Sequence, residues 1–201
     1  MKNLLIPLIA AFAANTVSAA APQQVIDIGT DKVSMVLTAA PGGEVYFRHF
    51  GGRIDDPAPL ADYKSNRRSD HGTEDLAYPA TGGRNFREPA LRGTHADGDM
   101  NTELRYVSHA SKQLSDKNVT ETVVDCCQAL DVELVFTAYA RENVITTHAV
   151  IRNREKGPVT LHSFYSSSLP LKADKYLLTH LYGAWAREAQ VDHTLLTHGS
   201  K

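Results

Sequence analysis

Histidine is the residue type in this chain best suited to metal chemistry, because a neutral imidazole nitrogen is a common metal ligand. The nine histidines are spread along the sequence, and no two sit at the short spacing that places both rings on one face of an element. The segment from Asp97 to Asn101 starts like a calcium-binding loop. However, Thr102 replaces the glycine of its sixth position and Ser108 replaces the glutamate of its twelfth. We therefore predict no metal site and no cofactor, and we expect a turn between strands here.

Paired carboxyl groups are the other candidates for chemistry, since two carboxyls can divide the roles of acid and base. The closest pairs in the sequence are Asp55 with Asp56 and Asp97 with Asp99. Both occupy turn-like segments with no apolar wall to raise the pKa of one carboxyl. A nucleophilic serine is not expected at residues 166–168 either, because the three serines lack a glycine elbow and follow a strand pattern. We predict no catalytic residue within this chain.

Cys126 and Cys127 are the only cysteines, and they are adjacent. Neighbouring residues do not form an unstrained disulfide, and in a strand their side chains point to opposite faces. We expect both thiols to be bystanders; the alternative is pairing between molecules.

The N-terminus has the pattern of a secretory signal peptide. Lys2 supplies a positive start, residues 4–14 are apolar, and Val17-Ser18-Ala19 is a small-residue cleavage site. We expect cleavage after Ala19, so that residues 20–201 are exported to the periplasm or the extracellular space; the alternative is an uncleaved anchor. Loss of Lys2 changes the net charge from −2 to −3, which gives no reason to expect nucleic-acid or membrane partners.

Alternation of apolar and polar residues is the dominant pattern of the chain, and it predicts half-buried strands. Residues 130–139 alternate strictly, residues 143–153 form a β-branched strand, and residues 159–169 run back after a turn, so we expect a three-stranded meander. Shorter strands are expected at residues 24–28, 33–38, 44–49, 104–108 and 119–126. This spacing, without a sustained amphipathic helix, predicts an all-β sandwich.

Residues 51–84 interrupt this pattern with prolines, glycines and charges and show little periodicity. A long irregular segment inside a compact domain is usually functional or disordered. The simpler interpretation is a flexible surface insertion.

Four stretches together resemble the N-terminal domain of glycoside hydrolase family 36 α-galactosidases. They are AYPATGGRNFREPAL (77–91), HADGDMNTELRYVSH (95–109), ENVITTHAVIRN (142–153) and HLYGAWAREAQVD (180–192). Their order and spacing also match, and the resemblance covers nearly the whole mature chain. It implies a single antiparallel β-supersandwich domain over residues 20–201. One departure is Asn85, where the family commonly has aspartate.

The resemblance also implies an activity, which family members carry in a TIM barrel that follows this domain. They remove terminal α-galactosyl residues from melibiose- and raffinose-type oligosaccharides by a retaining mechanism with two barrel aspartates. We expect a chain ending at Lys201 to lack that barrel, as a truncated gene product or a fragment. Its expected role is accessory: packing on the barrel, homo-oligomerisation and shaping the rim of the sugar pocket.

In the resembled family, parts of this domain reach the active site of an adjoining subunit, and residues 54–68 are the matching region here. Asp62, Arg67 and Arg68 are the candidate substrate contacts, because carboxylates accept and guanidinium groups donate hydrogen bonds to sugar hydroxyls.

Trp185 is the only tryptophan, and period alone fits its surroundings to a strand or a helix. By resemblance we expect it on a late strand or strand end, with its ring packed on a domain or subunit surface. Arg187 and Glu188, on opposite faces, would make polar contacts at that interface. The alternative is an ordinary core tryptophan.

Two other functions compete with the accessory domain. One is a free-standing carbohydrate-binding module in which Trp185, Tyr63 or Tyr78 stacks on sugar rings. The other is a purely structural oligomerisation domain.

Overall fold

The computed structural model describes residues 23–63, 72–83, 85–114, 118–127 and 129–197. Within these residues the elements are, in order, β1 (Gln24–Gly29), β2 (Val33–Ala39), β3 (Val45–Gly52), the 3₁₀ helix η1 (Ala58–Asp62), β4 (Leu91–Thr94), β5 (Arg105–Gln113), β6 (Val119–Cys127), β7 (Leu130–Tyr139), β8 (Val144–Asn153), β9 (Thr160–Phe164), β10 (Tyr176–Ala184) and β11 (Arg187–Leu196). The expected signal peptide lies outside the described residues.

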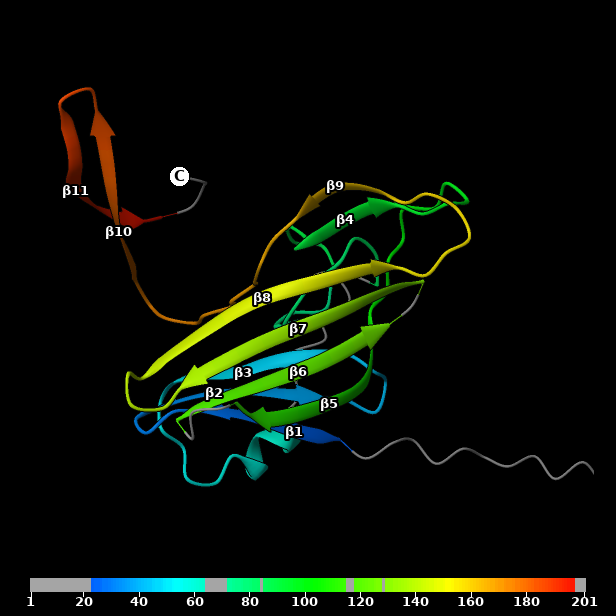
Figure 1. The fold of residues 1–201 in the computed structure, drawn as a ribbon, viewed down its shortest axis with the longest axis horizontal. Helices are drawn as coiled ribbons and strands as arrows, with labels where there is room; N and C mark the ends of the chain where they lie inside the picture. Colours follow the sequence, from blue (N-terminus) through cyan, green and yellow to red (C-terminus); the bar gives the residue numbers. More distant parts are fainter. Residues whose placement is uncertain (1–22, 64–71, 84, 115–117, 128, 198–201) are drawn as a thin grey trace, which may run out of the picture.

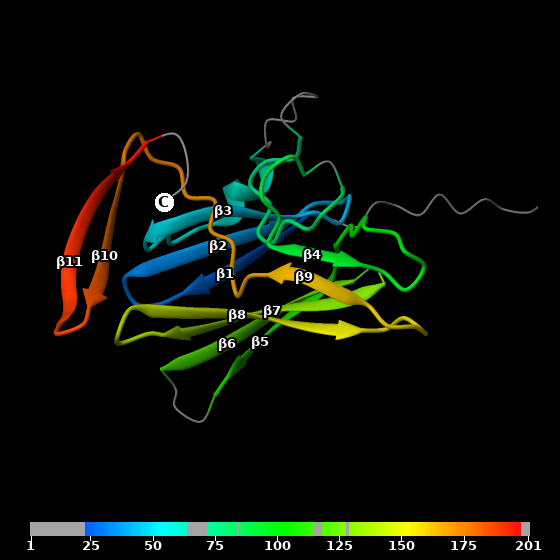
Figure 2. The ribbon, with the colours of Figure 1, turned by 90° about the horizontal axis from the view of Figure 1, so that it is seen from above.

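Two antiparallel sheets form the body of the molecule, one of strand order β1-β2-β3 and the other β5-β6-β7-β8. They lie face to face (Figures 1 and 2), and the core fills the space between them. Strand β7 contributes every second side chain to this core. These buried residues are Leu130, Val132, Leu134, Phe136 and Ala138. Ile26 and Leu37 of the facing sheet belong to the same cluster. The predicted all-β sandwich is confirmed.

The adjacent cysteines lie on β6 with their side chains on opposite faces, as expected. Cys126 is buried in the core and Cys127 is half-buried, and neither forms a disulfide. Burial raises the pKa of the Cys126 thiol to about 12. That thiol is therefore protonated and unreactive at neutral pH.

The predicted three-stranded meander is wrong in its last strand. Strand β9 ends at Phe164 and pairs with β4, not with β8. Beyond β9, the amide of Tyr165 donates to the carbonyl of Ala90 at 2.8 Å, and residues 166–169 form no strand. Strand β4 was not predicted, because four residues that include Gly93 are too few to display a period.

Residues 51–83 are more ordered than a surface insertion, in the part that the structure describes. Helix η1 begins after Pro57, where the amide of Ala58 donates to the Asp56 carboxylate at 3.0 Å. Further on, Leu76 bridges to Tyr46 of β3, and Ala77, Tyr78 and Ala80 are buried. The second part of this segment therefore belongs to the core.

Asn85 is suited to its turn as an amide. Its Oδ1 accepts from the Arg87 amide at 3.2 Å, and its Nδ2 lies 3.2 Å from the Arg87 carbonyl and 3.4 Å from the Ala80 carbonyl. Aspartate, with no donor, would keep only the first of these bonds.

Strands β10 and β11 form a separate two-stranded hairpin, drawn in orange and red in Figure 1. Neither pairs with a strand of the two larger sheets. Among the described residues, no helix is both long and apolar enough to cross a membrane.

Candidate functional site

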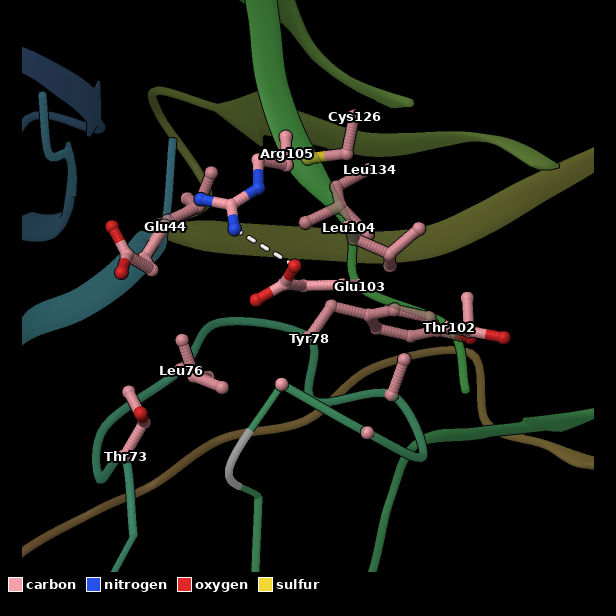
Figure 3. Close-up of a pocket in the computed structure, with 14 residues that line it drawn as sticks. Glu44, Thr73, Leu76, Tyr78, Thr102, Glu103, Leu104, Arg105, Cys126 and Leu134 are labelled. Atoms are coloured by element: carbon pink, nitrogen blue, oxygen red, sulfur yellow. Dashed lines mark ion pairs between the residues drawn. The ribbon is translucent and has the colours of Figure 1, made fainter. Parts of the chain in front are cut away.

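A small cavity opens where the segment 73–83 meets β3 and the start of β5 (Figure 3). Its volume is about 40 Å³, and an ion pair of 2.7 Å between Arg105 and Glu103 lies at its edge. That volume admits little more than one water molecule, which takes about 30 Å³ of liquid. The cavity is too small for a sugar ring.

Tyr78 lines this cavity but is not available for stacking on a sugar. It is 6% exposed, and its hydroxyl donates to the carbonyl of Tyr165 at 2.7 Å. Burial raises the pKa of this phenol. Tyr78 fixes the chain where it leaves β9, so the idea that it stacks on a ligand is wrong.

Asp62 and Tyr63 lie at the end of η1 on the surface. Both side chains are exposed, and the Tyr63 ring lies over the guanidinium of Arg48, 5.3 Å from centroid to Cζ. Arg48 also lies over the Tyr46 ring at 4.4 Å, so the guanidinium contacts two aromatic rings. Of the other candidate substrate contacts, Arg67 and Arg68 lie outside the described residues.

Trp185 lies at the tip of the β10–β11 hairpin. Ala184 pairs with Arg187, so that Trp185 and Ala186 form a two-residue turn, and Trp185 is 96% exposed. Ala186, the second residue of this turn, has a φ of 59°, in the left-handed region. The alternative of a core tryptophan is therefore wrong, and the ring lies at a strand end, as expected.

Gly183, two residues before Trp185, lies close to the backbone of the opposite strand. A Cβ at this position would lie 3.3 Å from the Cα of Glu188, within a bulge where the register between the strands shifts. Arg187 and Glu188 follow the turn as consecutive exposed residues of β11, at the start of the segment where the register between the strands shifts.

One face of this hairpin carries four exposed apolar side chains, two on each side of the hydrogen-bonded pair Thr179 and His193. Leu177 pairs with Leu195 and Leu181 with Val191, and these four side chains share a face because the pairs are four residues apart on each strand. Each is between 54% and 64% exposed. We refer to these four residues as the apolar hairpin face.

Asp97 and Asp99 form a turn, as predicted, between β4 and β5. The Asp97 carboxylate accepts from the Asp99 amide at 3.0 Å, and the Asp99 carboxylate accepts from the Asn101 amide at 3.0 Å. Within the described residues, no group of three or more potential ligands is arranged to hold a metal ion.

A buried histidine anchors this turn to the turn after β8. The His95 ring lies 2.5 Å from Glu155 Oε1 and 2.7 Å from the Thr102 hydroxyl, and the Ala96 amide donates to Glu155 Oε2 at 2.7 Å. The hydrogen bond from His95, followed by that from Ala96, lowers the pKa of the Glu155 carboxyl. No local motif marks this contact, because its partners lie far apart in sequence.

We expect Glu155→Gln to lower the Tm at neutral pH by about 2–4 °C. Because the pKa of Glu155 is lowered in the fold, its contribution is present above the ordinary value of 4.5 and is lost as pH falls through the lowered pKa. The Tm difference from the unchanged chain should therefore shrink below that pH. Thermal unfolding followed by circular dichroism from pH 7 to pH 3 measures it, with Glu142→Gln, an exposed glutamate, as the matched control. A pH-independent difference, or an equal loss in the control, would contradict this role.

The chain is similar to one family of known proteins, both by its family model and by its curated relatives. Residues 43–201 match the family model "Glycosyl hydrolase family 36 N-terminal domain". The chain is 28% identical over 186 residues to "Probable alpha-galactosidase G" of Emericella nidulans, covering 80% of this chain and 25% of that protein. It is 30% identical over 138 residues to "Alpha-galactosidase AgaA" of Geobacillus stearothermophilus, covering 61% of this chain and 19% of that protein.

Solved structures show the same similarity. A variant of the family 36 α-galactosidase AgaA from Geobacillus stearothermophilus, in complex with raffinose, superposes with a TM-score of 0.78 and 25% identity, covering 88% of this chain and 28% of that one. A second structure of AgaA from the same organism gives a TM-score of 0.79 at 24% identity. The chain thus spans about a quarter of the length of the relatives it matches.

Proposed function

This chain belongs to the glycosyl hydrolase family 36 N-terminal domain family, and from that premise we propose that it is the accessory domain of an exported α-galactosidase. The observation that carries the proposal is the family match over residues 43–201, together with relatives that are α-galactosidases. The signal-peptide pattern of residues 1–19 supports export. The enzyme's substrates would be oligosaccharides with terminal α-galactosyl residues, such as the raffinose bound to the AgaA variant.

The domain itself would contribute positioning and packing, while the barrel supplies the two catalytic carboxyl groups. Asp62, exposed at the end of η1, is suited to accept hydrogen bonds from sugar hydroxyls at the rim of the pocket. Arg67 and Arg68 would donate to the same sugar. Trp185, with Arg187 and Glu188 beside it, would contact the barrel or a second subunit, which is consistent with its exposure in the chain alone.

The rim role is tested by joining this chain to the remainder of Alpha-galactosidase AgaA, in place of the segment it matches. We expect Asp62→Ala to reduce kcat/KM for raffinose about tenfold, the effect of losing one hydrogen bond to a charged group. Asp31→Ala, which removes an exposed aspartate from the β1–β2 turn, is the matched control and should leave the kinetics unchanged. Unchanged kinetics in a double variant of Asp62→Ala and Arg67→Ala would rule the role out.

A free-standing carbohydrate-binding module is the second candidate. The observation that favours it is the exposure of Trp185 and Tyr63 on the described surface, because exposed aromatic rings are the usual platforms for sugars.

A further inference from the structure

A second cavity, distinct from that of Figure 3, lies beside the end of η1. Its volume is about 290 Å³, at the lower end of the range of about 300–1,000 Å³ that small-molecule sites occupy. Four segments far apart in sequence surround it, and the lining residues are Phe47, Arg48, His49 and Phe50 of β3, Leu60 and Tyr63 at η1, Asp75, and Pro170, Leu171 and Lys172 after β9. A space of this size fits one small ring.

Asp75 is the unusual residue of this cavity, because its side chain is only 5% exposed. Its Oδ2 lies 2.7 Å from the Lys172 ammonium, but its Oδ1 is buried with no hydrogen-bond partner among the described residues. A buried carboxylate oxygen without a hydrogen bond lowers the stability of the fold. Such an atom therefore suggests that a ligand supplies the donor.

The backbone holds Asp75 firmly in this position. Its carbonyl accepts from the Phe47 amide at 2.7 Å, and the next residue, Leu76, bridges to Tyr46. Its φ of 62° lies in the left-handed region, which few residues other than glycine, asparagine and aspartate adopt. The carboxylate is therefore placed by β3 and does not depend on a flexible loop.

The other polar groups of the cavity are donors. The Arg48 guanidinium is fixed between the Tyr46 and Tyr63 rings, and its Nε donates to the Thr38 hydroxyl at 2.8 Å. The Lys172 side chain is 61% exposed and belongs to a segment outside the strands, so its ammonium can move aside for an entering group. The exposed rings of Phe50 and Tyr63 add an apolar surface.

We propose that this cavity binds one ring of a neutral carbohydrate. A hydroxyl of the ring enters where Lys172 moves aside and donates to the Asp75 carboxylate, other hydroxyls accept from Arg48 and Lys172, and the apolar face of the ring contacts Tyr63 and Phe50. A sugar ring combines these donors, acceptors and apolar face in one small molecule.

This inference goes beyond the accessory-domain role, since it requires neither a barrel nor a second chain, and it deepens the second candidate function by naming a binding site. The experiment is a titration of the purified, ¹⁵N-labelled chain with methyl α-galactoside and, separately, methyl α-glucoside, followed by NMR. We expect saturable shifts with a Kd in the millimolar range for at least one of them.

The Asp75→Asn variant identifies the site. Asparagine tolerates the left-handed backbone, so this variant keeps the fold while it removes the charged acceptor. We expect at least about tenfold weaker binding. The matched control is Glu74→Gln, which changes the adjacent carboxylate, paired with Arg87 at 2.7 Å and outside the cavity lining, and should bind as the unchanged chain does.

Three results would overturn the inference. The first is no saturable shift with either glycoside up to tens of millimolar. The second is equal affinity in Asp75→Asn, and the third is an equal loss in Glu74→Gln. The rim role of Asp62 is measured separately, as kcat/KM in the joined enzyme. Evidence against sugar binding in the cavity would therefore not contradict the role of Asp62, and the reverse also holds.

Discussion

Purified by itself, this chain is expected to release no nitrophenol from an aryl α-galactoside above the rate in buffer. Retaining hydrolysis needs two carboxyl groups about 5–5.5 Å apart, one ionised as nucleophile and one kept protonated as acid. In the family both belong to the barrel, and the candidate pairs of this chain have other uses in the structure.

Several of the described carboxyl groups are engaged in turns and ion pairs. Asp56, Asp97 and Asp99 each accept a backbone amide two residues further on, which is the role of a turn residue. The carboxyl pKa values that depart from the ordinary range, those of Asp131 and Glu155, are lowered, mainly by hydrogen bonds from Arg154 and from His95. An acid catalyst requires the opposite shift.

The assay compares the chain with Alpha-galactosidase AgaA under the same conditions, which establishes that the substrate and buffer support turnover. Turnover by the chain that a single carboxylate substitution within residues 20–201 abolishes would show that the chain carries its own catalytic pair. The expected result is a rate indistinguishable from buffer for the chain and for every such variant.

At high concentration the chain is expected to self-associate through the apolar hairpin face, and Leu181→Asp is expected to weaken this association at least about a hundredfold. Burial of one leucine contributes about 1.5–3 kcal/mol, and in a symmetric dimer the substitution removes it from both copies and adds a charge to the contact. Four apolar side chains more than half exposed on one hairpin are the physical reason, since such patches usually mark interfaces.

Light scattering against concentration measures the association, and Trp185 reports it independently. Because Trp185 is almost fully exposed at the hairpin tip, its fluorescence should be red-shifted and quenchable in the dilute chain and should shift to the blue on association. The matched control is Val107→Asp, which places the same charge at an exposed apolar residue of β5. A chain that stays monomeric at high concentration, with Trp185 already blue-shifted and resistant to quenchers, would refute the interface.

Local pattern predicted the central strands well. The strictly alternating residues 130–139 correspond to β7, and residues 143–153 to β8 within one residue, because half-buried strands carry their period in consecutive residues. The family suggested by four sequence stretches is confirmed by the match over residues 43–201. The family could be identified without a structure because its motifs are short runs of contiguous residues.

The errors occurred where the chain reverses direction or pairs at long range. The turn at Trp185-Ala186 lacks the asparagine–glycine signature of tight hairpins, so residues 180–192 appeared to be one element. The small residues at positions 183, 184 and 186 were the available signal. Strand β9 was assigned to the wrong partner because pairing depends on which edge lies nearby, and its sequence does not encode the position of β4.

The sequence by itself therefore determined the all-β class, the long strands β7 and β8, and the family, since burial period and family motifs are properties of contiguous residues. Only the tertiary structure decided that Trp185 lies at an exposed tip, that β9 pairs with β4, and that Asp75 meets Arg48 and Lys172 around one cavity. The physical reason is that these contacts join segments separated by many residues. Their proximity results from the packing of the two sheets and from the path of the chain after β9, which no local pattern specifies.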